Sequence, residues 1–150
     1  AAALTLLGDA GKGWLAVVLA RLAASAWNLD PDVIAGVAIL AFVGHLWPVY
    51  FKFRGGKGVA TAGGILFAVN PWLGLGTVST WLIIAFFFRY SSLAALVAAV
   101  FAPFAYIALY RIDGMFVAIS LIAALLLWRH AANITRLLQG TARIYPEVTR

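Results

Sequence analysis

The amino-acid sequence predicts an all-α, polytopic integral membrane protein, and three observations predict this class. Of the 150 residues, 65% are hydrophobic and only 11% are charged, whereas soluble domains are about half apolar and about a quarter charged. The apolar residues form blocks that approach the length needed to cross a bilayer, with the charges confined to the joins between them. No block alternates in the manner of a membrane barrel, so backbone polar groups in hydrocarbon must pair within helices.

Six apolar stretches predict six transmembrane or membrane-embedded helices. They lie near residues 1–24, 33–51, 58–69, 71–88, 92–110 and 114–132. The first stretch is the least regular, because Gly8, Asp9, Gly11, Lys12 and Gly13 interrupt its apolar character. The third would form only about 18 Å of helix against a hydrocarbon core of about 30 Å. Residues 133–150 predict a short, basic and partly helical tail.

A tight turn is predicted between the third and fourth stretches. Pro71 suits the first position of a helix, and the residue before a proline, Asn70, avoids helical geometry. The two stretches are therefore expected to run antiparallel.

The distribution of Lys and Arg predicts the orientation in the membrane. If all six stretches cross, one side collects nine of the eleven cations and leaves Arg21 and Arg111 on the other. The nine are Lys12, Lys52, Arg54, Lys57, Arg89, Arg129, Arg136, Arg143 and Arg150. If the short third stretch does not cross, the counts become five and six, so the biased distribution favours crossing. The nine-cation side should be cytoplasmic, and the acidic turn with Asp30 and Asp32 external.

Composition also argues against several classes of partner and cofactor. The net charge of +6 is first explained by topology and by attraction to anionic membrane lipid. The cations are few and lie between apolar spans, which argues against a nucleic-acid site. Cysteine is absent, and two histidines with five acidic residues offer no convincing metal-ligand cluster. No cofactor is expected, and the sequence does not indicate an oligomeric state.

The segment Gly44–Gly58 is the most informative part of the chain. It places three cations, Lys52, Arg54 and Lys57, beside Gly55, Gly56 and Gly58 at a junction between two helices. Glycines let backbone amides approach an anion closely, and Lys57 stands where the next helix begins, so phosphate is the expected ligand. A positive loop made flexible by glycine remains the alternative. A Walker loop is excluded, because Phe51 occupies its first glycine position and Gly58 its Ser or Thr position.

Two histidines and an acid–base pair complete the polar candidates. For His45, which lies just before Pro48, a structural hydrogen bond that helps to fix the loop is the favoured interpretation. His130, Asn133 and Arg136 would share one face if the helix continues through them, which is typical of a polar site. A helix end capped by interfacial polar groups explains the same spacing equally well. Asp9 and Lys12 lie one turn apart, and pairing with each other is their simplest role.

Together these segments resemble the acyl-phosphate:glycerol-3-phosphate acyltransferases, a bacterial membrane family of the PlsY type. The loop Gly44–Gly58 resembles the family motif G-H-x-[FW]-P-[VI]-x-x-x-F-x-G-G-K-G. Arg129-His130, Asn133-Ile134, Arg136-Leu137 and Gly140-Thr141 resemble the C-terminal motif. Asp9, Lys12 and Gly13 match D-x-x-K-G.

The resemblance implies transfer of an acyl group from acyl phosphate to the 1-hydroxyl of glycerol 3-phosphate, in the bacterial inner membrane with the site facing the cytoplasm. The products would be lysophosphatidic acid and phosphate. It makes Lys57 a phosphate ligand, Gly55, Gly56 and Gly58 the glycerol-phosphate loop, and His130 and Asn133 active-site residues. Neither histidine has an Asp five residues later, so the H-x-x-x-x-D pattern of acyl-CoA-dependent enzymes is missing.

Some positions depart from the family pattern. Ala131 and Ala142 stand where the family often has Arg and Glu. The family also has a further helix and a serine-, glycine- and asparagine-rich loop before the position of Asp9, and the only methionine here is Met115. We therefore expect residues 1–150 to be a single transmembrane acyltransferase domain without its N-terminal helix and first motif, with seven helices in the intact protein.

Two other classes of function explain part of the sequence. A small transporter of a phosphorylated or anionic solute could also place cations between helices, but it would more often place them in mid-membrane. A structural membrane subunit would leave the glycine-lysine loop without a role.

Overall fold

The computed structural model describes residues 2–53 and 55–144. Within them lie seven α-helices and one 3₁₀ helix. The bounds are α1 (Ala2–Trp27), α2 (Asp32–Leu46), the 3₁₀ helix η1 (Val49–Phe51), α3 (Val59–Val69), α4 (Pro71–Phe88), α5 (Ser91–Leu109), α6 (Gly114–Arg129) and α7 (Ala131–Leu138). The described part of the chain is thus all-α, as predicted, and each of the six apolar stretches overlaps one of the helices α1 to α6.

Local sequence explains where several helices begin. The Asn70 side chain accepts hydrogen bonds from the amides of Trp72 (2.8 Å) and Leu73 (3.2 Å), and Pro71 occupies the first turn of α4. Asp113 caps α6 by accepting from the Phe116 amide at 2.9 Å. The glycines near Asp9 do not interrupt α1, which is continuous over 26 residues, because neighbouring helices compensate for weak helix formers.

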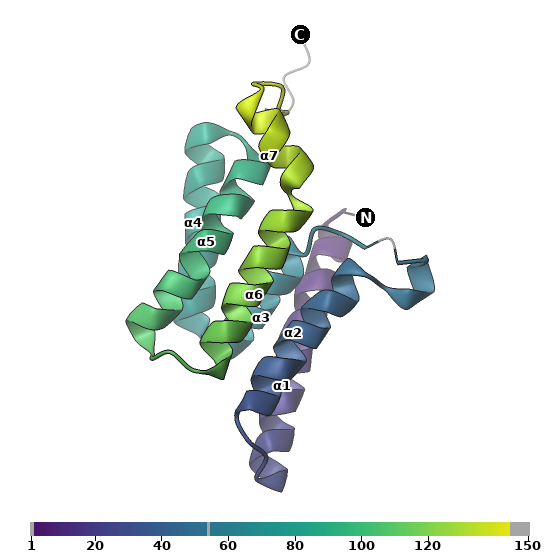
Figure 1. The fold of residues 1–150 in the computed structure, drawn as a ribbon, viewed down its shortest axis with the longest axis vertical. Coiled ribbons are helices and arrows are strands. Elements are labelled where there is room, and N and C mark those ends of the chain that lie inside the picture. The colour runs from purple at the N-terminus through teal and green to yellow at the C-terminus, as the bar shows by residue number, and fades with distance from the viewer. Residues whose placement is uncertain (1, 54, 145–150) are drawn as a thin grey trace.

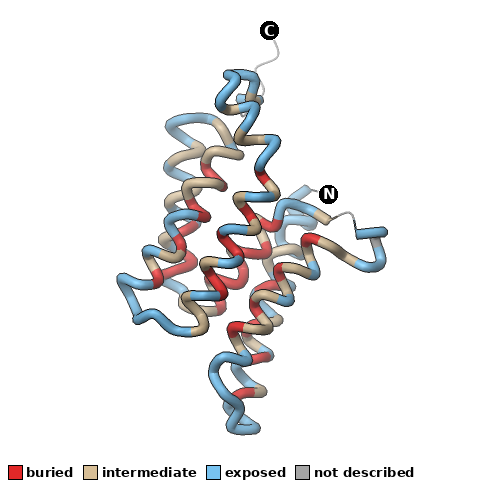
Figure 2. The backbone as a smooth tube through the Cα atoms, in the orientation of Figure 1, coloured by how far each residue is buried: buried red, intermediate tan, exposed pale blue. Residues whose placement is uncertain are grey.

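Six helices close into a bundle in which each packs mainly against two neighbours, in the order α1, α3, α4, α5, α6, α2 and back to α1, and α2 also contacts α3 (Figure 1). Figure 2 colours the backbone of the buried residues red, and these segments lie where the helices face one another. Val17, Phe42, Leu46, Ile65 and Leu126 form the centre of the larger core cluster. The short α7 continues from α6 with a bend of 58°.

The outer surface of the bundle is apolar, as expected for a protein surrounded by lipid. Large exposed hydrophobic side chains occur along the helices, among them Leu19, Leu82, Phe86 and Phe104. By length and composition, α1, α4 and α5 can each cross a membrane, and α6 with α7 forms a fourth, bent candidate. The apolar helices α2 and α3 are shorter; α3, with 11 residues, is about 16 Å long.

The two ends of the bundle carry different polar groups. At one end, Lys12 of α1 contacts His45 of α2, and Arg129 of α6 contacts the loop before α3. At the other end, Arg21 donates hydrogen bonds to the Ala68 and Val69 carbonyls at the end of α3 (2.6 and 3.2 Å). This separation agrees with the predicted placement of Lys12 and Arg129 opposite Arg21.

Candidate functional site

The glycine-lysine loop is held against the end of the helical bundle. Arg129 donates to the carbonyls of Gly55 (3.1 Å) and Gly56 (3.2 Å), residues more than seventy positions away in sequence. Gly58 has φ of +84° and precedes α3, and a Cβ atom there would collide with the ring of Phe42. Glycine is therefore required at position 58 for both its conformation and its lack of a side chain. Lys57 is consequently fixed at the N-terminus of α3, where the helix dipole adds positive potential.

A polar cavity of about 940 Å³ opens beside Lys57. Its wall combines the start of α3 with α7, the start of α5 and the segment after α7. Polar residues of this wall are Lys57, Ser91, Ser92, His130, Asn133, Arg136, Thr141 and Arg143. The cavity thus brings cations and hydroxyl groups from four parts of the chain to one place, which suits an anionic ligand.

His130 lies at the junction between α6 and α7 and is only 2% exposed. Its Nδ1 is 2.8 Å from the Leu126 carbonyl oxygen. Because a carbonyl only accepts, this contact assigns the proton to Nδ1 and leaves Nε2 with a lone pair. The expectation that a single helix continues through His130 and Asn133 is wrong, since the chain bends at His130 between α6 and α7. The bend nevertheless leaves His130, Asn133 and Arg136 together on the cavity wall.

The pKa of the Lys57 side chain is perturbed by its surroundings. Desolvation of its ammonium group, with a further contribution from the Arg136 cation, lowers the pKa of Lys57 below its ordinary value. The two cations thus share one cavity and repel each other, and an anion bound between them would relieve this repulsion.

The remaining predicted site residues lie elsewhere. Asp9, Lys12 and His45 contact one another behind the loop: Lys12 Nζ is 2.7 Å from both Asp9 Oδ1 and His45 Nδ1. The structure thus contains the predicted Asp9–Lys12 pair. His45 makes a hydrogen bond, but to Lys12, and its role in fixing the loop stays a prediction. Lys52 ends η1 in an exposed, left-handed conformation with φ of 53°. Among the described residues, the cavity wall does not include Lys52, and Arg54 lies outside those residues. Their role as phosphate ligands stays a prediction.

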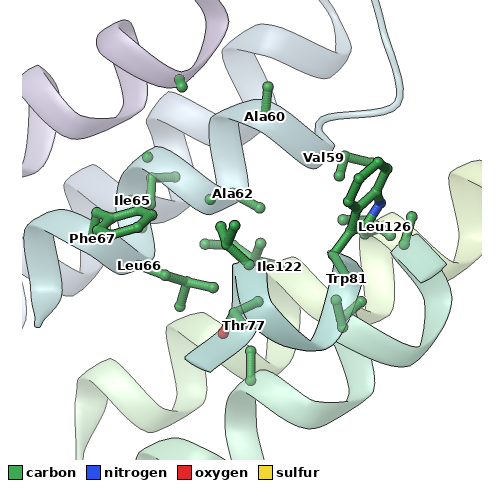
Figure 3. Close-up of a pocket in the computed structure, with 18 of the residues that line it drawn as sticks. Val59, Ala60, Ala62, Ile65, Leu66, Phe67, Thr77, Trp81, Ile122 and Leu126 are labelled. Carbon is green, nitrogen blue, oxygen red and sulfur yellow. The ribbon is translucent and has the colours of Figure 1, made fainter. Parts of the chain in front are cut away.

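A second cavity, of about 400 Å³, lies inside the bundle and is almost wholly apolar. Figure 3 shows Val59, Trp81 and Leu126 at one side of it, and Phe67 and Leu66 toward the other. Along α5 the wall is a row of small residues, Ala95, Ala98, Ala99 and Ala102. Leu6, Val59, Trp81 and Ala95 line both cavities, so the apolar cavity adjoins the polar one.

The glycerol-3-phosphate acyltransferase family model matches residues 1–140. The chain belongs to this family. The resemblance inferred from the loop and the C-terminal motif is thereby confirmed, and the glycine-lysine loop and the His130 junction both lie inside the matched region.

Proteins named glycerol-3-phosphate acyltransferase from three bacteria illustrate the membership. The Ralstonia nicotianae protein is 62% identical over 140 residues, covering 93% of this chain and 68% of the relative. The Cupriavidus necator protein is 61% identical, covering 93% and 69%. The Burkholderia multivorans protein is 59% identical, covering 93% and 65%.

Solved structures confirm the fold. The chain superposes on crystal structures of PlsY (YgiH), an integral membrane glycerol 3-phosphate acyltransferase, with 34% identity. The glycerol 3-phosphate form gives a TM-score of 0.89 over 95% of this chain and 70% of that chain. The lysophosphatidic acid form gives 0.88 over 95% and 71%. The prediction of an all-α, multi-pass membrane protein is therefore confirmed for this family member.

Sequence reasoning did not identify the apolar cavity, nor Trp81, Ser91 and Ser92 as residues of the polar cavity wall. One signal was available for the apolar cavity: the spacing of Ala95, Ala98, Ala99 and Ala102 places four small residues on one face of a helix. The contributions of Trp81 and the two serines depend on helix packing and carry no comparable local signal. Sequence reasoning also did not predict the contact of Arg129 with the loop, where it donates to the Gly55 and Gly56 carbonyls.

Proposed function

We propose that the protein transfers an acyl group from acyl phosphate to the 1-hydroxyl of sn-glycerol 3-phosphate, forming lysophosphatidic acid and inorganic phosphate. The site is proposed to face the cytoplasm from the bacterial inner membrane. The observation that carries this proposal is the junction of the two cavities at Leu6, Val59, Trp81 and Ala95.

The two cavities suit the two chemical parts of the reaction. The polar cavity holds Lys57 and Arg136, which can bind phosphate groups as cations. The apolar cavity lies between α1, α3, α4, α5 and α6 and offers hydrocarbon surroundings for an acyl chain. A donor whose chain occupies the apolar cavity would place its acyl carbon near the junction, within reach of a polar acceptor.

The proposed chemistry is direct transfer. The substrate hydroxyl oxygen attacks the acyl carbon, a new ester C–O bond forms, and the bond from that carbon to the phosphate oxygen breaks. Phosphate leaves with the electron pair, so the donor is already activated and an acyl-enzyme is not required. Lys57 stabilises the negative charge that develops, and Nε2 of His130 accepts the hydroxyl proton. The phosphate group of the substrate is the alternative base.

The names of related proteins support the acceptor. The curated relatives are named glycerol-3-phosphate acyltransferases, and PlsY was crystallised in forms with glycerol 3-phosphate and with lysophosphatidic acid. The choice of acyl phosphate as donor rests on the family resemblance and on the missing H-x-x-x-x-D pattern.

The test uses the intact protein in detergent or lipid and follows inorganic phosphate release from palmitoyl phosphate, with and without glycerol 3-phosphate. Lys57→Ala is compared with Arg111→Ala, which also removes one cation. Arg111 follows the C-terminal end of α5, whereas the polar cavity lies at the N-terminal end of that helix. We expect release that depends on glycerol 3-phosphate, is lost in Lys57→Ala and persists in Arg111→Ala.

Other outcomes would change the assignment. Activity with acyl-CoA but not with palmitoyl phosphate would overturn the assignment of acyl phosphate as the donor. A burst of about one phosphate per protein without glycerol 3-phosphate would replace direct transfer by an acyl-enzyme. Inactivity with both donors, together with uptake of glycerol 3-phosphate into vesicles, would favour the transporter.

A further inference from the structure

Three polar side chains form a cluster behind the glycine-lysine loop: Asp9 and Lys12 from α1 and His45 from the last turn of α2. We call them the loop-support cluster. Lys12 Nζ lies 2.7 Å from Asp9 Oδ1 and 2.7 Å from His45 Nδ1, and His45 Nδ1 lies 3.4 Å from Asp9 Oδ1. The side chain of His45 is nearly buried. None of the three is among the described residues that line either cavity, so the cluster would act on a ligand only through the loop.

The geometry assigns a tautomer to His45. A lysine ammonium group donates hydrogen bonds and cannot accept them, so Nδ1 of His45 must be the acceptor and the proton must be on Nε2. The imidazole is thus neutral and held in one orientation, with Nε2 toward the loop. A Cβ atom added to Gly56 would lie only 2.7 Å from this Nε2, so the ring packs directly on the Gly56 backbone.

The opposite side of the same two glycines is held by Arg129, which donates to the Gly55 and Gly56 carbonyls. The backbone at Gly56 therefore lies between an imidazole from α2 and a guanidinium from α6. Lys57 is the next residue, and its backbone direction follows from this arrangement.

Close packing of α1 on α3 makes the cluster a rigid support. A Cβ atom at Gly13 would lie 2.5 Å from the Thr61 carbonyl oxygen, and one at Gly64 would collide with the Ala10 backbone. The backbones of the two helices are thus in direct contact on both sides of Lys12. The lysine is carried by a helix that cannot move independently of the start of α3, which begins at Val59, directly after the loop.

We propose that Asp9, Lys12 and His45 are positioning residues for the phosphate of glycerol 3-phosphate, acting through Gly56 on Lys57. This inference rests on the proposed function. Asp9 neutralises and orients Lys12, Lys12 fixes the imidazole of His45, and His45 fixes the loop. Loss of the cluster weakens binding of the acceptor, because the loop then has to be ordered by the ligand. Binding of the acyl donor is little affected, because its chain occupies the apolar cavity, whose wall includes neither the cluster nor Lys57.

The test measures initial rates of the intact protein. One series varies glycerol 3-phosphate at saturating palmitoyl phosphate, and the other varies palmitoyl phosphate at saturating glycerol 3-phosphate. Lys12→Met and His45→Leu are each expected to raise KM for glycerol 3-phosphate about tenfold, the effect of losing one hydrogen bond to a charged group. KM for palmitoyl phosphate should stay within about twofold. His45→Asn, which keeps an acceptor near the position of Nδ1, should restore most of the affinity, and the double variant Lys12→Met/His45→Leu should be no worse than either single variant.

Arg21→Met is the matched control. Arg21 is also a cation of α1 that ties this helix to α3, but at the far end of α3. We expect this variant to lower the unfolding temperature without changing KM for glycerol 3-phosphate.

Three results would overturn the proposal. One is an unchanged KM for glycerol 3-phosphate in both Lys12→Met and His45→Leu. Another is a parallel rise for both substrates that follows the loss of thermal stability. The third is a fall in kcat with both KM values unchanged. A parent protein without glycerol-3-phosphate-dependent phosphate release would instead refute the proposed function.

Discussion

Replacement of His130 by Gln tests the proposed proton acceptor. The side chain is 2% exposed, lies on the cavity wall and donates from Nδ1 to the Leu126 carbonyl. General-base catalysis contributes about 10² to 10⁴ in rate, so we expect kcat to fall at least about 10²-fold in His130→Gln. The lost hydrogen bond to Leu126 costs about 1 kcal/mol of stability, which is too little to unfold the protein. Glutamine can still hydrogen bond to the substrate hydroxyl but cannot take up its proton at neutral pH.

The assay is phosphate release from palmitoyl phosphate at saturating glycerol 3-phosphate, repeated over a range of pH, beside a thermal unfolding measurement. If His130 accepts the proton, the acidic fall of kcat in the parent protein disappears in His130→Gln. A kcat within about threefold of the parent, with the acidic fall retained, would refute this role and assign the base to the substrate phosphate. A large loss of thermal stability would also refute the reasoning about the hydrogen bond.

Three further predictions follow from the cavities and the loop. Ala102→Phe places a large side chain about 10 Å along α5 from the junction at Ala95, so activity should shift toward shorter acyl phosphates; an unchanged chain-length profile would contradict the acyl role of the apolar cavity. Gly64→Ala should destabilise the protein by about 1–3 kcal/mol in thermal or denaturant unfolding, because its Cβ meets the Ala10 backbone. A Cβ atom at position 63 would lie in open space, so Gly63→Ala should not destabilise the protein. Equal losses of stability in both variants would show that the α1–α3 contact is not the cause. Because the pKa of Lys57 is lowered by desolvation and by Arg136, kcat/KM for glycerol 3-phosphate should fall on the alkaline side at a lower pH than an ordinary lysine would give. Arg136→Gln should move this fall to higher pH, and a fall that does not move would refute the coupling of the two cations.

Much of the fold could be predicted because its signals are local. Apolar stretches marked all six bundle helices, including the short α3, and Asn70-Pro71 marked the turn between α3 and α4. The glycines in α1 were misleading as signs of an interruption, since α1 is continuous and Gly13 allows close packing against Thr61 of α3. A helix end near His130 was predicted, since the sixth stretch was expected to end near residue 132, but the bend of 58° between α6 and α7 was not, because no proline or glycine stands there.

The candidate site was predictable only in part. The spacing of Gly55, Gly56, Lys57 and Gly58 predicted a phosphate loop, since glycine and lysine at a helix start favour anion binding, and the structure places Lys57 on the wall of the polar cavity. The same reasoning included Lys52, which the structure places in an exposed turn outside the described cavity wall. Charge type is visible in a sequence, whereas the direction in which a loop projects is not.

By itself, the sequence determined that this is a helical membrane protein and to which family it is similar, and it supplied the candidate site residues. These properties depend on composition, hydrophobic length and short spacing. Only the tertiary structure decided that the polar and apolar cavities adjoin, that Lys12 reaches His45 across 33 positions, and that Arg129 holds Gly55 across 74. The physical reason is that such contacts arise from the order in which helices pack, and neighbouring residues along the chain do not specify that order.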